Sequence, residues 1–385
     1  MKIRSKFTEG IFRLAGIPVL AAALLLPIQA WAQADSGKDR SPREVYLSAC
    51  AACHGADGRG QSQGRVGFSV PLPDFTDCNF ATREPNADWV AVAHQGGPVR
   101  GFDQIMPAFG ETLSVEELEK AVEYTRTFCR DESWPRGALN LPRALVTEKA
   151  YPEDEAVLTF GAGEDFNSIS GELVYEQRFG ARSQFEIVVP FGWNEIMVPD
   201  NTGMASDWRS GLGDVAIGAK RAFLHSLKSG SILSGAAEII LPTGDRAEGL
   251  GKDTFVFEPF VSYGQILPAD FFLHSQLGFE VPFQSSKAEN EAFFRMALGR
   301  TFTTGGWWGR AWSPMVEVLA SRELVSGEEI MWDILPQFQV TLNTRQHIML
   351  NIGVRIPVTD AGGRDYQIMA YLLWDWFDGV FFEGW

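Results

Sequence analysis

The chain is poor in basic side chains and in long apolar runs. Its 385 residues contain 33 lysines and arginines against 49 aspartates and glutamates, which gives a net charge of −16. So acidic a protein has no electrostatic attraction for a phosphate backbone, and no nucleic acid is expected as a partner. Residues 14–27 form an apolar run, but this run is too short to span a membrane comfortably.

The N-terminus has the pattern of an export signal. Lys2, Arg4, Lys6 and Arg13 precede the apolar run, and Ala30-Trp31-Ala32 follows it as a small-x-small cleavage site. We therefore expect residues 1–32 to be a signal peptide. An exported bacterial chain enters the cell envelope, where cysteines can be oxidised.

Cys50, Cys53 and His54 form a C-x-x-C-H motif, which occurs once. This spacing is required for covalent attachment of haem c, because the two thiols add across the vinyl groups and the histidine is carried to one face of the iron. The alternative is a chance or redox-active C-x-x-C pair beside a histidine. The motif and the export signal together predict one covalently bound haem c.

The composition changes along the chain at residues 131–152, where proline and charge cluster without an apolar period. We interpret this stretch as a linker. It separates a helical domain, residues 41–130, from residues 153–385, in which no helical pattern occurs.

Two helices are predicted around the motif. Ser41-Pro42 begins one that runs into Cys50, and Ser114 with Glu117 forms a capping box for the second. The loop between them contains Met106, whose thioether could bind the other face of the iron, since His/Met is a standard axial pair. The rival ligand is His94.

Residues 41–130 resemble a class I cytochrome c, because the motif, Gly55 and Gly58, the Met-Pro-Ala-Phe loop and the C-terminal helix stand in family order. The resemblance implies His54 as the proximal ligand and Met106 as the distal one. It also implies that the carbonyl of Pro71 or Pro73 accepts a hydrogen bond from His54. Cys78 and Cys129 lie outside the family pattern, and in an oxidising compartment we expect a disulfide between them rather than two buried thiols.

The second half of the chain alternates between apolar and polar residues, as in Ile348, Leu350 and Ile352 against His347 and Asn351. This period indicates half-buried strands. Twelve such runs occur, at 154–163, 167–179, 182–193, 212–224, 230–242, 253–266, 270–283, 290–303, 310–323, 329–342, 346–358 and 364–377. An even number of antiparallel strands of this length is typical of a transmembrane β-barrel.

The connections also alternate between short turns and longer polar loops, the latter at 194–211, 243–252, 284–289 and 359–363. Barrels of bacterial outer membranes place short turns in the periplasm and carry aromatic girdles. Aromatic residues gather at the strand ends: Phe191, Trp193, Trp307, Trp308, Trp374, Trp376, Phe381, Phe382 and Trp385. The ending resembles the C-terminal signal of outer-membrane proteins, and the barrel resembles the outer-membrane family associated with aromatic-compound degradation. The soluble alternative is a β-sandwich or a lipocalin-like barrel.

Acidic residues dominate the positions predicted to face inward. They are Glu172, Glu176, Glu186, Asp214, Glu238, Glu258, Glu280, Glu317 and Asp333, accompanied by Arg178, Lys220, Arg295 and Arg355. Two interpretations stay open, a cation-attracting lumen and a packed, salt-bridged interior. His274 and His347 are expected to be hydrogen-bonded lumen residues and not metal ligands.

The sequence therefore predicts a multidomain protein, in which a small all-α class I cytochrome c domain precedes an all-β antiparallel transmembrane barrel of about twelve strands. It resembles fused cytochrome–porin proteins, although here a whole cytochrome domain precedes the barrel. The expected function is one-electron exchange with periplasmic redox proteins or an extracellular donor or acceptor, by a periplasmic haem domain tethered to outer-membrane lipid. The alternatives are a pore or transporter with an attached haem sensor or redox module, and a haem enzyme, against which Met106 ligation argues.

Overall fold

The computed structural model describes residues 40–163, 166–200, 203–304, 309–342, 347–359 and 364–376, with only the backbone at 199–200 and 203–205. The predicted signal peptide lies outside the described residues. So do Trp307 and Trp308, the turn at 343–345 and the aromatic C-terminal ending.

The N-terminal region is built of short helices. They are α2 (Pro42–Ala49), α3 (Ala51–His54), α4 (Gln63–Val66), α5 (Cys78–Ala81), α6 (Asn86–Gln95), η1 (Gly97–Arg100) and α7 (Val115–Arg126). The predicted capping box of Ser114 with Glu117 is present, and the predicted capping residue Ser41 also forms a capping box, with Glu44. Among the described residues, no helix is both long and apolar enough to cross a membrane.

The helical region has its own core. Helix α7 packs against α2 and α6, and the contact buries Val45 of α2, Val90 of α6 and Leu118 and Val122 of α7. Ala49, Cys50 and Phe109 pack against this cluster. The core thus fixes the end of α2, where the C-x-x-C-H motif begins, relative to the later helices.

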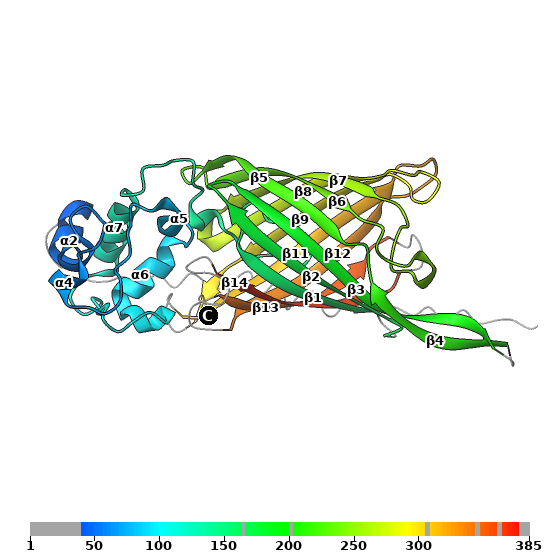
Figure 1. Ribbon diagram of the computed structural model, residues 1–385, viewed down its shortest axis with the longest axis horizontal. Coiled ribbons are helices and arrows are strands. Elements are labelled where there is room, and N and C mark those ends of the chain that lie inside the picture. Colours follow the sequence, from blue (N-terminus) through cyan, green and yellow to red (C-terminus); the bar gives the residue numbers. More distant parts are fainter. Residues whose placement is uncertain are drawn as a thin grey trace, which may run out of the picture. The chain divides into compact units, whose positions relative to one another are not determined.

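The rest of the chain forms one antiparallel sheet (Figure 1). Its strands are β1 (Glu155–Gly163), β2 (Ser168–Phe179), β3 (Ser183–Asp200), β4 (Gly203–Leu212), β5 (Ala216–Ser226), β6 (Ser231–Ile240), β7 (Val256–Ile266), β8 (Phe271–Pro282), β9 (Glu291–Arg300), β10 (Phe302–Thr303), β11 (Ala311–Glu323), β12 (Met331–Thr341), β13 (Ile348–Pro357) and β14 (Gln367–Asp375).

Twelve of these strands close into a barrel. Neighbouring strands in the chain pair with one another, β14 pairs with β1, and β9 pairs with β11, so the described sheet returns on itself. The two-residue strand β10 adds to β11, and β4 pairs with β3 outside the closed ring. The predicted twelve-strand antiparallel barrel is therefore confirmed.

One predicted loop is wrong. Residues 194–200 and 203–211 are paired strands, because β3 continues to Asp200 and pairs with β4 from Phe191↔Leu212 to Asp200↔Gly203 in a hairpin arrangement. Figure 1 shows this hairpin extending beyond its neighbours. The polar character of the segment suggested a loop, but backbone pairing in a two-stranded extension does not need an apolar face.

The two faces of the barrel differ in polarity. Large apolar side chains are exposed on the outside of nine strands: Leu173, Ile187, Ile217, Val261, Leu277, Leu298, Ile334, Ile352 and Leu372. Polar side chains are buried inside: Glu176, Glu186, Lys220, Ser262, Gln276, Glu317, Asp333, Gln337 and Asn351. A soluble barrel would bury its apolar face, so this arrangement is that of a barrel surrounded by lipid.

Charge on the outer face should therefore prevent assembly. Ile352 of β13 is 51% exposed and points outward, so Ile352→Arg should cost about 2–4 kcal/mol near the middle of the membrane. The measurement is folding into lipid vesicles, followed by gel mobility without heating. Ile352→Leu is the matched control and should fold normally. Equal folding of the Ile352→Arg and Ile352→Leu proteins would contradict a lipid-facing position for this residue.

Candidate functional site

The C-x-x-C-H motif lies at the junction of two helices. Cys50 ends α2, where its N–H donates to the carbonyl of Tyr46 at 2.8 Å, and the one-turn helix α3 then carries Cys53 and His54. The N–H of His54 donates to the carbonyl of Cys50 at 2.9 Å. Both thiols are free and half-buried, so one helical turn presents two thiols and an imidazole together.

The imidazole of His54 is held by packing. Its ring stacks on Phe75 with 4.9 Å between ring centroids, and burial lowers the pKa of His54 to about 4. A neutral imidazole is the form that binds a metal. Its Nδ1 atom is buried without a hydrogen-bond partner among the described residues. The predicted bond to the carbonyl of Pro71 or Pro73 is not present in this structure and stays a prediction.

The loop that contains Met106 is fixed to α6 by backbone hydrogen bonds. The N–H of Gly97 donates to the carbonyl of Met106 at 3.0 Å, and the N–H groups of Phe109 and Gly110 donate to carbonyls in the last turn of α6. Gly96 has φ +86°, and a Cβ there would lie 3.0 Å from the Met106 carbonyl oxygen. Glycine at this position thus allows the loop to approach the helix closely.

His94, the rival ligand, is engaged elsewhere. Its Nδ1 atom lies 2.8 Å from the side-chain amide of Gln95, and its ring covers Gly110 so closely that a Cβ on that glycine would meet it at 2.4 Å. His94 and the Met106 loop both lie at the C-terminal end of α6, and the choice between them stays a prediction. The position of Met106 in an anchored loop favours it.

Cys78 and Cys129 form a disulfide across 51 residues of sequence. Cys78 begins α5 and Cys129 follows α7, so the bond joins the middle of the helical region to its end. In the chain-entropy treatment, a closed loop of this length contributes about 4 kcal/mol to stability. The pairing also leaves Cys50 and Cys53 as the free thiols of the chain.

These observations fit haem c. Two free thiols, one buried neutral imidazole with an unpartnered nitrogen and an aromatic ring beneath it are the donor set and surroundings that covalent haem attachment needs. Cys50 and Cys53 would hold the porphyrin and His54 would hold the iron. Bound haem would supply reversible one-electron chemistry.

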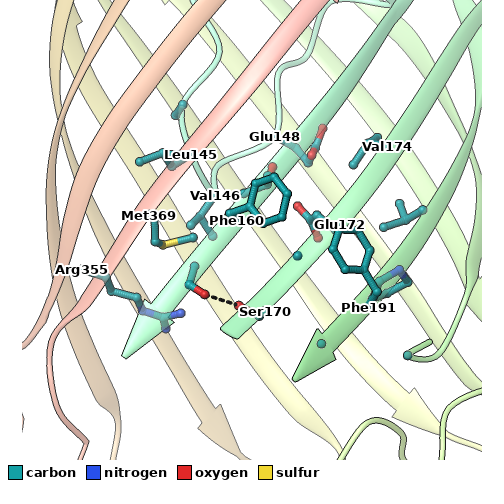
Figure 2. A pocket seen from close by; sticks show the side chains of 18 of the residues that line it. Leu145, Val146, Glu148, Phe160, Ser170, Glu172, Val174, Phe191, Arg355 and Met369 are labelled. Carbon is teal, nitrogen blue, oxygen red and sulfur yellow. Dashed lines mark hydrogen bonds between the residues drawn. The ribbon is translucent and has the colours of Figure 1, made fainter. Parts of the chain in front are cut away.

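The second candidate site is the barrel lumen. Residues 137–154, here called the plug segment, run inside the ring of strands, where Figure 2 shows Leu145, Val146 and Glu148. Leu145 packs among buried residues of five strands, Leu141 and Ala144 pack against Phe272 and Met315, and Leu139 packs against Ile232. Most of the stretch interpreted from sequence as a linker is therefore buried.

Inward polar side chains bind the backbone of the plug segment. The N–H of Leu145 donates to Gln337 Oε1 at 3.0 Å, and the N–H of Thr147 donates to Glu317 Oε2 at 2.7 Å. Gln276 and Gln184 accept in the same way from the N–H groups of Glu148 and Glu153. Each bond replaces one that water would otherwise make, so the plug segment is held although its only regular element is the short helix η2 (Gly137–Leu139).

Two buried cations of the plug segment bind glutamates. Arg143 lies 2.7 Å from Glu155 and 3.0 Å from both Glu148 and Glu176. Lys149 lies 2.5 Å from Glu153 and 3.0 Å from Glu155. Removing one member of such a network would leave a buried charge uncompensated. The packed interpretation of the lumen is thus correct at this end of the barrel.

Glutamates stand opposite one another on successive strands. The register pairs Glu155 with Glu176 and Glu176 with Glu186, and it reaches Glu238 through Gly218. It then pairs Glu238 with Glu258, and further along Glu280 with Glu291 and Glu291 with Glu323. We call this set the glutamate row. It runs from the first residue of β1 to the last residue of β11, which are opposite ends of the barrel.

A cavity of about 500 Å³ lies beside the plug segment. Its lining includes Glu172, Glu186, Glu238 and Glu258 from the strands and Arg143, Ala144, Leu145, Val146 and Glu148 from the plug segment. Figure 2 shows Glu172 and Glu148 in this lining. His274 and His347 make hydrogen bonds, as predicted: His274 Nε2 lies 2.9 Å from the carbonyl of Pro142, and His347 Nδ1 lies 3.2 Å from that of Asp375.

Sequence reasoning missed the plug segment and with it Arg143, Lys149 and Glu148. The backbone N–H groups of Leu145, Thr147 and Glu148 donate to side chains more than a hundred residues away, so the segment has no period that could indicate burial. One signal was available. The proline-rich stretch contains the cations Arg143 and Lys149, and the strands contain more inward glutamates than inward cations. This imbalance could have indicated that the stretch enters the barrel.

Two family models match the chain. Residues 37–124 match "Cytochrome C oxidase, cbb3-type, subunit III", and residues 159–346 match "Putative MetA-pathway of phenol degradation". The N-terminal part therefore matches a c-type cytochrome family, and the twelve-strand barrel resembles outer-membrane porins and the phenol-degradation barrel family.

Solved structures of outer-membrane proteins are similar to the barrel. An outer membrane channel from Pseudomonas putida F1 is 12% identical, with a TM-score of 0.41 over 61% of this chain and 99% of that one. The NanC porin is 8% identical, with a TM-score of 0.39 over 57% of this chain and 98% of that one. No curated protein sequence matches the chain.

Weakening the plug segment should open the barrel. Glu317→Ala removes the acceptors of the Val146 and Thr147 N–H groups, and each buried donor left unpaired costs about 1–3 kcal/mol. Channel recordings in planar bilayers should show rare openings for the native protein and frequent ones for the variant. Val318→Leu, an outward change on the same strand, is the control. Steady conduction by the native protein would contradict the expectation that the plug segment closes the barrel.

Proposed function

We propose that the protein is a haem c electron carrier tethered to the outer membrane, exchanging single electrons with redox partners. The observation that carries the proposal is the C-x-x-C-H turn, with two free thiols and a buried neutral imidazole, in a chain that continues into a barrel with an apolar exterior. The matches to a cytochrome c family and to an outer-membrane barrel family support it.

The proposal gives individual residues distinct roles. Cys50 and Cys53 would attach the haem, His54 would bind one face of the iron, and Met106 would bind the other. Phe75 excludes water from the imidazole ring on which it stacks. With both axial positions filled, no site is open for bond-making chemistry, so the domain transfers electrons instead of catalysing a reaction.

The connectivity of the barrel supports a periplasmic haem domain. An even number of strands returns the chain to the side from which it started, and β1 starts at the end with the short turns Gly180–Arg182 and 267–270. In outer-membrane barrels this end faces the periplasm. The plug segment enters the barrel from the same side, directly after the cytochrome domain.

The buried plug segment favours an anchor over an open pore. Its cations and backbone are bound to the barrel wall by ion pairs and hydrogen bonds. Partners on the periplasmic side are therefore preferred to an electron donor that must pass through the lumen. A solute pore with an attached haem module remains the second candidate, favoured by the cavity beside the plug segment.

The distal ligand can be tested with one variant. Met106→Ala should abolish the thioether-to-iron absorption band and lower the reduction potential by about 0.1 V or more, because thioether ligation favours ferrous iron. The measurement is an optical redox titration of the purified holoprotein. Ile105→Ala, a change in the same loop, should leave both properties unchanged. If His94→Ala changes them and Met106→Ala does not, His94 is the ligand.

The function can be tested in cells. A reductant that cannot cross the outer membrane should leave the haem oxidised in intact cells and reduce it once that membrane is permeabilised. Absorbance of the reduced haem provides the readout. Protease added to intact cells should cleave the β3–β4 hairpin and spare the cytochrome domain. Reduction in intact cells would place the electron exchange at the cell surface instead.

A further inference from the structure

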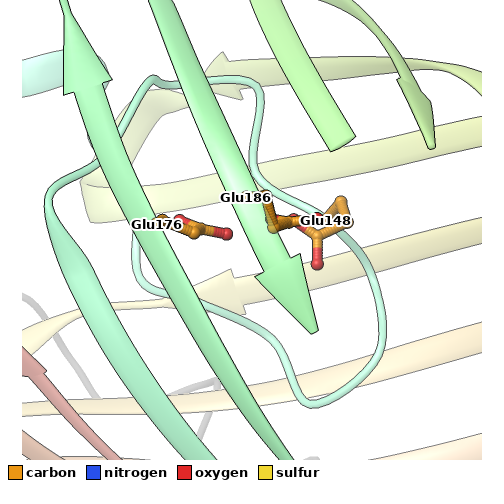
Figure 3. Close-up of side chains that lie close together, drawn as sticks. All are labelled: Glu148, Glu176 and Glu186. Atoms are coloured by element: carbon orange, nitrogen blue, oxygen red, sulfur yellow. The ribbon is translucent and has the colours of Figure 1, made fainter. Parts of the chain in front are cut away.

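Three carboxylates meet where the plug segment faces the barrel wall. One oxygen each from Glu148 of the plug segment, Glu176 of β2 and Glu186 of β3 lies within 4.8 Å of the other two. Figure 3 shows Glu176 extending toward Glu186 and Glu148. Because Glu176 and Glu186 are paired in register, two carboxyl groups stand directly opposite one another, which is destabilising unless a cation or a shared proton lies between them.

Arg143 binds only one carboxylate oxygen of Glu148 and one of Glu176. The bound atoms are Oε1 of Glu148 and Oε1 of Glu176, both at 3.0 Å. The Oε2 atom of each is buried without a hydrogen-bond partner in the described structure, and Glu176 is 0% exposed. Among the described residues, no ion pair reaches Glu186. A buried carboxylate oxygen without a partner is costly, so its position indicates a ligand.

Lys220 is the nearest further cation. Its Nζ atom is 3.7 Å from Glu148 Oε2, too far for a hydrogen bond, and is itself buried without a partner. Lys220 therefore reduces the negative charge of the cluster without occupying its centre. It also competes with any cation that binds there.

The cavity beside the plug segment gives access to the cluster. Glu148 and Glu186 belong to its lining, together with Glu172, Glu238 and Glu258. Of the three arginines in the same lining, Arg143 is shared with Glu155 and Glu176, and Arg355 is bound to Asp333. The lining is thus acidic on balance, and it attracts cations to the cluster.

We propose that Glu148, Glu176 and Glu186 bind a divalent metal cation in the barrel lumen. Carboxylate oxygens are the ligands of hard cations such as Ca²⁺, Mg²⁺ and Mn²⁺, and water supplies the remaining ligands. The cation joins the plug segment to β2 and β3 and offsets the repulsion within the glutamate row. This proposal does not rest on electron transfer, because no group of the cytochrome domain takes part.

Mn²⁺ is the probe for the test, which uses the full-length holoprotein in detergent. Binding removes the signal of the free ion from the electron paramagnetic resonance spectrum. The native protein should bind one Mn²⁺, and Glu186→Gln should weaken binding by at least about tenfold, because ligand charge sets affinity. Glu291→Gln, another member of the glutamate row outside the cluster, is the control and should bind like the native protein.

A second variant separates loss of the site from loss of folding. Lys220→Met removes the competing ammonium and should strengthen Mn²⁺ binding. Heat-dependent gel mobility and the haem spectrum should be unchanged in all variants. No Mn²⁺ binding by the native protein, or equal binding by the native and Glu186→Gln proteins, would overturn the proposal and leave the cluster bridged by water or a shared proton. Neither outcome would affect the electron-transfer proposal.

Discussion

The structure depends on one constraint, that every backbone hydrogen bond inside a membrane must be made within the protein. The pairing of β9 with β11 satisfies this constraint, because the described sheet then has no free edge within the ring. A closed sheet with lipid outside must turn its apolar residues outward, as Ile352 and Leu372 do. Its polar residues then face a narrow lumen, where they too need partners.

The plug segment provides those partners. Arg143 connects Glu155 of β1, Glu176 of β2 and Glu148, while its carbonyl accepts a hydrogen bond from Tyr371 at 2.7 Å. The exchange is mutual, since Gln337 and Glu317 satisfy backbone N–H groups of the plug segment. Neither the wall nor the plug segment would be stable with the other removed, because each would leave buried polar groups unpaired.

Local patterns in the sequence were sufficient for the regular elements. Ser41 with Pro42 predicted the start of α2, and the capping box at Ser114 predicted the start of α7. The two-residue period predicted strands such as β8, expected at 270–283 and found at Phe271–Pro282. The C-x-x-C-H motif indicated its own chemistry. The cluster of Glu148, Glu176 and Glu186 could not be predicted from the sequence, because Glu148 is brought to the two strand residues only by the path of the plug segment. That path is determined by side chains distant in sequence and not by a local period.

The order of synthesis gives the plug segment a further significance. Its acceptors Gln276, Glu317 and Gln337 lie on strands made long after it, and the bond from Leu145 spans 192 residues. The helical region has its own core and can therefore fold while residues 137–154 are still extended. Docking of this segment cannot precede the arrival of β12, so it is among the last steps of assembly, and it couples completion of the barrel to a region that can fold before it.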